Sequence, residues 1–217
     1  MITAMLIDFG GVIAEEGFYE GLLAIGRKNG IDPLKFFEAS DGLIAATGYL
    51  TGAVDESDFW NEVRRRTGVA EDDASLRREI LSRFVLRQDM LDQMDCLREQ
   101  GLTVAMLSDQ TNWLEEIDAA TGLFRHFDRV FNSYRLHKSK RDASVFRDVC
   151  AALGVRPEET LFVDDNRNHI RRAESQGLRT FHFTRVRDFT SELNTIFKGA
   201  QIDADERGCR RTVARDP

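Results

Sequence analysis

Short apolar runs recur along the chain. After Leu102, these runs alternate with segments whose apolar residues have the spacing of a helix. Five runs are predicted as strands: Met5–Ile7, Thr103–Leu107, Arg129–Phe131, Leu161–Val163 and Thr180–Phe183. Apolar residues at intervals of three or four predict helices over Trp113–Thr121, Asp142–Leu153, Arg167–Gln176 and Asp188–Phe197. Strands that alternate with helices in this way predict an α/β fold, with a mainly parallel sheet and helices on both faces.

Residues 15–89 break this alternation, because they contain successive helical patterns and no clear strand. The predicted helices are Phe18–Lys28, Leu34–Ala46 after the Asp32-Pro33 pair, a helix between Asp55 and Gly68, and Asp72–Phe84. We interpret this stretch as a helical cap inserted between the first and second strands. The prediction is a core of residues 1–14 and 90–198, a cap over 15–89, and a flexible tail over the polar, unpatterned residues 199–217.

Composition narrows the class of protein and of partner. The chain has 217 residues, 42% hydrophobic and 31% charged, which is enough for one domain with a sizeable insert. A net charge of -7 argues against binding to nucleic acid or to an anionic membrane. No secretory signal or membrane-spanning run is visible, and we interpret Cys96, Cys150 and Cys209, which lack CxxC spacing, as reduced. We therefore expect a cytoplasmic protein, with the choice between monomer and homodimer left open.

Polar side chains follow three of the predicted strands where each strand ends. They are Asp8, the Ser108-Asp109 pair and the Asp164-Asp165 pair. Ligands of parallel sheets bind at the carboxyl ends of the strands, so we expect these residues to share one site. The glycine-rich turn after Asp8 can also present backbone N–H groups to an anion.

Lys140, at the start of a predicted helix, adds a cation to this set. Taken alone, each residue also fits a plain role as a turn residue, a helix cap or a solvated charge. Together they provide a nucleophile, a hydroxyl donor to phosphate, a counter-cation and a pair of metal-ligating carboxylates. These groups are what phosphoryl transfer through an aspartyl-phosphate requires.

Four motifs occur in order: Asp8 in Asp-Phe-Gly-Gly-Val, Ser108 in Leu-Ser-Asp, Lys140, and Asp164-Asp165 in Phe-Val-Asp-Asp-Asn. With a helical insert after the first, they resemble the haloacid dehalogenase (HAD) superfamily over residues 1–198. The chain is most similar to the bacterial phosphatase branch that acts on α-glucose-1-phosphate, which has a cap element like Thr51–Phe59. The resemblance implies a Rossmann-like parallel sheet with an inserted α-helical cap. It also implies a Mg²⁺-dependent phosphatase whose partner is a small phosphate ester, such as a sugar phosphate.

The resemblance also assigns roles to individual residues. Asp8 is the expected nucleophile, Ser108 the donor to a phosphoryl oxygen, and Lys140 the neutralising cation. Mg²⁺ is expected on Asp8, on the carbonyl of Gly10 and on Asp164 or Asp165, with Asp165 favoured as the direct ligand. Phe9, Gly10 and Asp109 are expected to contact the substrate, and aromatic residues near Phe18 or Tyr49 to line the pocket.

Three positions depart from the family pattern. Gly10 stands where most HAD phosphatases have a second aspartate as general acid and base; Glu15 or Glu16 could replace it, or could simply form a solvated hinge. Arg141 replaces the proline after the lysine, which leaves Lys138 as a second candidate for the cation. His169 stands where another acidic residue is common.

Two alternatives to a phosphatase follow. A 2-haloacid dehalogenase uses the same aspartate to attack carbon and has no need of a metal, so the Asp164-Asp165 pair argues against it. A HAD-fold binding protein with weakened catalysis would explain Gly10 and Arg141. The retention of Asp8 together with its partners argues against that second alternative.

Overall fold

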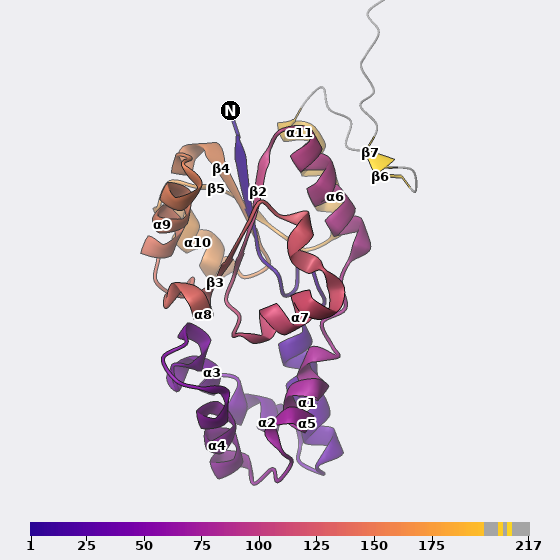
Figure 1. Ribbon diagram of the computed structural model, residues 1–217, viewed down its shortest axis with the longest axis vertical. Helices are drawn as coiled ribbons and strands as arrows, with labels where there is room; N and C mark the ends of the chain where they lie inside the picture. Colours follow the sequence, from indigo (N-terminus) through magenta and orange to yellow (C-terminus); the bar gives the residue numbers. More distant parts are fainter. Residues whose placement is uncertain (198–203, 206–207, 210–217) are drawn as a thin grey trace, which may run out of the picture.

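The computed structural model describes residues 1–197, 204–205 and 208–209. Its central sheet has the strand order β3-β2-β1-β4-β5 and is parallel throughout (Figure 1). The strands are β1 (Ala4–Ile7), β2 (Thr103–Ser108), β3 (Arg129–Asn132), β4 (Thr160–Asp164) and β5 (Arg179–His182). The predicted α/β fold with a parallel sheet is confirmed, and each predicted strand is present.

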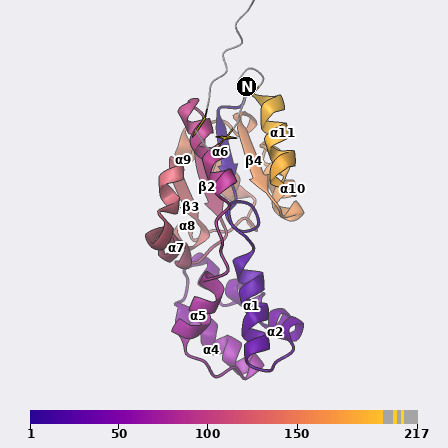
Figure 2. The same ribbon diagram turned by 90° about the vertical axis from the view of Figure 1, so that its right-hand side faces the viewer.

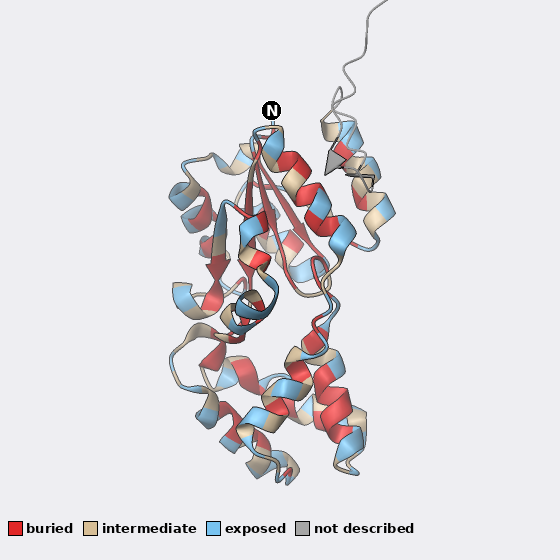
Figure 3. Cartoon of the chain, turned by 45° about the vertical axis from the view of Figure 1, so that its right-hand side comes forward, coloured by how far each residue is buried: buried red, intermediate tan, exposed pale blue. Residues whose placement is uncertain are grey.

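Alternate side chains of each strand point to opposite faces of the sheet, and each face has its own helices. Met5 and Ile7 belong to the larger core, which includes α6 (Gln88–Glu99), α7 (Trp113–Thr121) and α11 (Val186–Ile196). Leu6 belongs to the smaller core, with α9 (Ser144–Leu153) and α10 (Arg167–Ser175). Figure 3 shows that burial is concentrated on the strands and the inner sides of the helices. Because both faces are covered, the central strands are apolar at nearly every position.

Five helices form the cap, which lies beyond the carboxyl ends of the strands (Figures 1 and 2). They are α1 (Gly17–Lys28), α2 (Pro33–Ser40), α3 (Leu43–Ala46), α4 (Glu56–Thr67) and α5 (Asp73–Leu81). Local sequence sets their ends: Asp32 accepts a hydrogen bond from the backbone N–H of Lys35 at 3.0 Å, and Gly68 ends α4 with a φ of 75°. The division into 1–14 with 90–198 and 15–89 stays a prediction.

Some helices differ from the prediction. The helix expected over Leu34–Ala46 is two helices, because Ser40, Asp41 and Gly42 are weak helix formers and interrupt it. Helix α6 was not predicted, although Met90, Met94 and Leu97 give it an apolar face. Short elements were also missed: α8 (Ser133–Leu136) and the 3₁₀ turns η1 (Tyr49–Thr51), η2 (Leu123–His126) and η3 (Pro157–Glu159).

Hydrogen bonds join the cap to the core at a place away from the two chain connections. The hydroxyl of Tyr49 donates to Oδ1 of Asn112 at 2.6 Å. The hydroxyl of Ser133 donates to the carbonyl of Leu50 at 2.9 Å. Segment η1 of the cap is therefore hydrogen-bonded to the core segments that follow β2 and β3, and the cap is held on both sides of the space above the sheet.

The predicted tail from Gly199 lies outside the described residues, except for the backbone pairing of β6 (Ala204–Asp205) with β7 (Gly208–Cys209). Cys150 is a buried free thiol. Cys96 is disulfide-bonded, so the interpretation of every cysteine as reduced is wrong for this residue. Over the described residues, each helix is too short or too polar to cross a membrane.

Candidate active site

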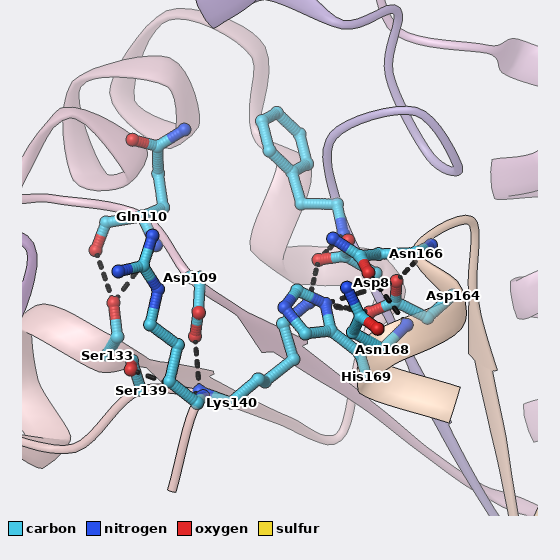
Figure 4. A network of polar contacts seen from close by, with 12 residues as sticks. Asp8, Asp109, Gln110, Ser133, Ser139, Lys140, Asp164, Asn166, Asn168 and His169 are labelled. Carbon is cyan, nitrogen blue, oxygen red and sulfur yellow. Dashed lines mark hydrogen bonds and ion pairs between the residues drawn. The ribbon is translucent and has the colours of Figure 1, made fainter. Parts of the chain in front are cut away.

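Asp8 follows β1 directly, at the carboxyl end of the central strand. Its backbone N–H donates to the carbonyl of Val163 at 2.9 Å, which extends the pairing of β1 with β4 by one residue. Its Oδ1 accepts a hydrogen bond from the backbone N–H of Phe9 at 2.7 Å, and the residue is 8% exposed. The central strand therefore fixes one carboxylate at the floor of the site (Figure 4).

Lys140 is the buried cation of the site. Its Nζ lies 2.7 Å from Oδ1 of Asp8 and 2.7 Å from Oδ2 of Asp164. Its backbone N–H donates to Oδ1 of Asp109 at 2.8 Å, so Asp109 anchors the loop that carries the lysine (Figure 4). Burial lowers the pKa of Lys140, but the charges of Asp164 and Asp8 outweigh burial and raise that pKa above its usual value. Lys140 therefore stays charged at neutral pH.

The second lysine of this loop makes its contacts elsewhere. The Nζ of Lys138 lies 2.5 Å from Oδ2 of Asp148 and donates to Oγ of Ser144 at 2.9 Å, both on the exposed surface of α9. Of the two lysines left open by the sequence, the structure brings Lys140 to Asp8.

Asp164 ends β4 and Asp165 follows it, but their surroundings differ. Asp164 is fully buried; its Oδ1 accepts a hydrogen bond from the backbone N–H of Asn166 at 2.7 Å, and Nδ1 of His169 lies 3.1 Å from its Oδ2. Burial raises the pKa of Asp164, but Lys140 and His169 outweigh it and lower that pKa to about 2. Asp165 is exposed to the cavity, and no other described residue donates a hydrogen bond to its carboxylate. Burial and the charge of Asp164 raise the pKa of Asp165.

The acidic cluster has the ligands and the charge that suit a divalent cation. Oxygen atoms of Asp8, Asp164 and Asp165 lie within 4.8 Å of one another. Burial, together with the charges of Asp164 and Asp165, raises the pKa of Asp8 although Lys140 lowers it. A bound cation would relieve this repulsion, and carboxylate oxygens are the ligands that Mg²⁺ prefers. The residues present therefore fit Mg²⁺.

Two glycines leave room for carboxylates that come from elsewhere. Gly11 has a φ of 76°, and a Cβ at this position would lie 2.2 Å from Oδ2 of Asp165. A side chain there would both strain the backbone and displace the carboxylate. A Cβ at Gly10 would lie 3.2 Å from Oε2 of Glu16.

The two acidic residues after this turn take different positions. Glu15 forms an ion pair with Arg87, whose Nη2 lies 3.0 Å from its Oε2. Glu16 lines the cavity, and none of the described residues donates a hydrogen bond to its carboxylate. Burial by the surrounding walls, followed by the charge of Asp165, raises the pKa of Glu16 to about 7. Of the two residues left open by the sequence, the structure brings only Glu16 to the site.

A cavity of about 890 Å³ lies between the cap and the core. Ser108 borders it at the end of β2, and within the described residues its Oγ has no hydrogen-bond partner. The cap contributes Phe18, Tyr19, Phe37 and Asp41 to the lining. The rings of Tyr19 and Phe37 meet edge to face, with 4.8 Å between their centroids. The cavity therefore combines a polar floor with an aromatic and acidic cap wall.

Of the two aromatic positions named for the pocket wall, Phe18 lines the cavity and Tyr49 does not, and Phe9, expected to contact the substrate, does not line it either. The ring of Phe9 is buried against Phe84, with 5.3 Å between centroids. Tyr49 is also fully buried and bonds to the core. Sequence reasoning in turn missed Asn168 and Arg172 of α10, which line the cavity. Asn168 is three residues after Asp165, and Arg172 is four residues after Asn168. This spacing could have indicated them, because helix positions three and four apart share one face.

Known proteins show which family the chain is similar to. The family model for haloacid dehalogenase-like hydrolases matches residues 2–177. The chain belongs to this family. The HAD family enzyme bt-2542 from Bacteroides thetaiotaomicron has the same fold, with a TM-score of 0.73 and 23% identity over 88% of this chain and 98% of that one. The L-2-haloacid dehalogenase from Xanthobacter autotrophicus has a TM-score of 0.65 and 19% identity, over 91% of this chain and 84% of that one.

Among curated proteins, the GMP/IMP nucleotidase YrfG of Escherichia coli is 27% identical over 124 residues, which are 56% of this chain and 53% of that protein. The chain spans about half the length, or less, of the curated relatives it matches. These findings identify a HAD-family hydrolase with phosphatase relatives. Since dehalogenases share the fold, the residues of the site distinguish the two reactions.

Proposed function

We propose that this HAD-family hydrolase is a Mg²⁺-dependent phosphatase that cleaves a small phosphate monoester through an aspartyl-phosphate on Asp8. The observation that carries the proposal is the 2.7 Å ion pair of Asp8 with Lys140, beside the acidic Asp164-Asp165 pair. A carboxylate cannot approach a phosphoryl dianion closely unless positive charge offsets the repulsion. Attack on the neutral carbon of a haloacid does not need an acidic metal site, so the cluster favours phosphorus over carbon.

The ligands proposed for Mg²⁺ are Asp8, the carbonyl of Gly10 and Asp165. Asp164 is a support rather than a direct ligand in this proposal, because both of its oxygens already accept hydrogen bonds from within the chain. When bound, the metal supplies charge that stabilises the phosphoryl oxygens. The bt-2542 enzyme has been crystallised with magnesium and inorganic phosphate, which supports this choice of metal.

The chain's own residues perform the proposed reaction in two halves. Asp8 attacks phosphorus, and the bond from phosphorus to the leaving alcohol oxygen breaks. Ser108 donates its hydroxyl hydrogen to a phosphoryl oxygen, and Lys140 favours the ionised form of Asp8 and offsets the incoming charge. Water then attacks the aspartyl-phosphate, which releases phosphate and restores Asp8.

A sugar phosphate is the substrate class that we propose. Carboxylates such as Asp41 accept hydrogen bonds from hydroxyl groups, and the edges and faces of Tyr19 and Phe37 can pack on the apolar face of a sugar ring. The curated nucleotidase relative acts on nucleotides, which are also phosphate monoesters of a sugar.

Phosphate release tests the proposal directly. We expect Mg²⁺-dependent hydrolysis of p-nitrophenyl phosphate and of members of a sugar-phosphate panel, abolished by EDTA and by Asp8→Asn. Asp92→Asn is the matched control, because Asp92 lies exposed on α6 and bonds only to Gln88 among the described residues. Wild-type turnover no higher than that of Asp8→Asn across the panel would refute the phosphatase. Halide release from chloroacetate in EDTA would establish the dehalogenase instead.

A further inference from the structure

The leaving oxygen of a phosphate ester needs a proton unless it departs as a stable anion, and the residues described so far do not provide one. Asp8 is the nucleophile, and Lys140 holds both Asp8 and Asp164. Asp109 is bonded to the backbone of the Lys140 loop, and His169 is bonded to Asp164. Each of these groups has another task or another partner.

Asp165 is a proposed ligand of the metal, which leaves Glu16 as the candidate carboxyl group at this end of the cavity. It lines the same cavity as Asp8 and Ser108, and within the described part of the chain its carboxylate has neither a hydrogen-bond donor nor a salt-bridge partner. It stands at the N-terminal boundary of α1 and makes no capping hydrogen bond, so local structure does not account for its side chain. Asp41, another acid of the cap wall, lies instead beside the charge of Arg141.

The position of Glu16 suits proton transfer to the leaving oxygen. Its Oε2 lies 3.2 Å from where a Cβ of Gly10 would stand, so it fills space directly above the turn that follows the nucleophile. In an in-line displacement the leaving oxygen lies on the far side of phosphorus from the attacking oxygen. Asp8 attacks from the floor, so the leaving oxygen points toward the cap, and Glu16 lies at the start of the cap.

We infer that Glu16 is the catalytic acid and base of this enzyme, taking the position that a side chain at residue 10 would otherwise hold. The inference rests on the proposed phosphatase function. In the first half-reaction the bond from Asp8 to phosphorus forms, the ester bond breaks, and the leaving oxygen takes the proton of the Glu16 carboxyl group. In the second half water gives a proton to the Glu16 carboxylate, its oxygen bonds to phosphorus, and the bond to Asp8 breaks.

Leaving-group dependence tests this role. With Glu16→Gln, we expect the rate of the first half-reaction, measured as release of the alcohol in a single turnover, to fall by about 10²–10⁴-fold for an ester such as glucose-1-phosphate or glycerol phosphate. For p-nitrophenyl phosphate this rate should fall by less than about tenfold, because nitrophenolate leaves without a proton. Glu15→Gln is the matched control and should leave both rates unchanged, since Glu15 is paired with Arg87 outside the cavity.

A rescue variant separates a catalytic role from a structural one. Glu16→Ala empties the space above Gly10, and adding Gly10→Asp places a new carboxyl group there. We expect the double variant to recover alkyl-ester hydrolysis over Glu16→Ala alone. Equal losses on both ester types, or no loss on either, would overturn the role of Glu16 while Asp8-dependent turnover still supports the phosphatase. Absence of wild-type turnover on every ester would overturn both.

Discussion

Replacing Lys140 with methionine should destabilise the protein strongly, because it leaves two buried carboxylates without their cation. Lys140 is 1% exposed and contacts both Asp8 and Asp164 at 2.7 Å. Removing one partner of a buried ion pair costs about 3–5 kcal/mol of unfolding free energy. For a chain of this size, that loss lowers the melting temperature by about 6–20 °C.

The matched control is Lys138→Met, because Lys138 sits in the same loop with an exposed partner. Solvent screens exposed ion pairs, so they contribute little, and this variant should unfold almost like the wild type. Urea unfolding in EDTA measures both variants, and phosphate release measures activity. We expect Mg²⁺ to restore part of the stability of Lys140→Met, since the metal offsets the same carboxylates. A Lys140→Met variant as stable as Lys138→Met, or as active as the wild type, would refute the reasoning.

The difference between Lys140→Met and the wild type should also depend on pH. In the wild type, Lys140 and His169 hold the pKa of Asp164 at about 2, below its unfolded value. A carboxyl group with a lowered folded pKa contributes stability above its unfolded pKa and loses that contribution as the pH falls through the folded value. Lys140→Met removes the main source of this shift, so its deficit should be largest near neutral pH and narrow in acid. A deficit that stays constant down to the acid transition would contradict this account.

Three further variants probe the residues around the site. Gly11→Ala should weaken Mg²⁺-dependent stabilisation in thermal unfolding, because the new Cβ would lie 2.2 Å from Oδ2 of Asp165. The control is Gly30→Ala: Gly30 has a φ of 67° and no atom near its Cβ position, so only about 1–2 kcal/mol of backbone strain is expected. Arg87→Gln should cost about 1.5–3 kcal/mol in urea unfolding, because Arg87 donates charged hydrogen bonds to two carbonyls of the turn after the nucleophile; exposed Arg83→Gln should change little. Tyr49→Phe should cost about 0.5–1.5 kcal/mol by removing the 2.6 Å hydrogen bond from cap to core, and an unchanged unfolding midpoint would show that this contact does not hold the cap.

The fold was readable from the sequence because its signals are local. Leu161–Val163 is a continuous apolar run, as a strand buried on both faces must be, and Asp55 and Gly68 mark the two ends of α4. Helix α6 was not predicted because it begins directly after the cap, at a position without a typical N-cap residue. Arg87 precedes the helix, and its side chain makes no capping hydrogen bond. The break at Gly42 was hidden by apolar residues on both sides that keep helical spacing.

The floor of the site could be anticipated because parallel strands bring their ends together. Asp8 and Asp164 are adjacent in space simply because β1 pairs with β4 in register. In the cap wall, Phe18 lines the cavity as expected, but the other lining residues could not be anticipated in this way. Tyr19 and Phe37 share an apolar character with residues of the cap interior, and only the packing of α1 on α2 decides that they face the cavity. Specificity therefore depends on the part of the chain where sequence patterns say least.

The pair Gly10-Gly11 changes meaning once its surroundings are known. In the sequence, a glycine at position 10 signals a missing acid. In the structure, both glycines border carboxylates supplied by other segments: Gly11 leaves space for Asp165 from the end of β4, and Gly10 leaves space for Glu16 from the start of the cap. An aspartate at position 10 would compete with Glu16 for one space. With Glu16 as the acid, Gly10 and Glu16 together do what an aspartate at position 10 would do. Each should therefore tolerate substitution only when the other changes with it.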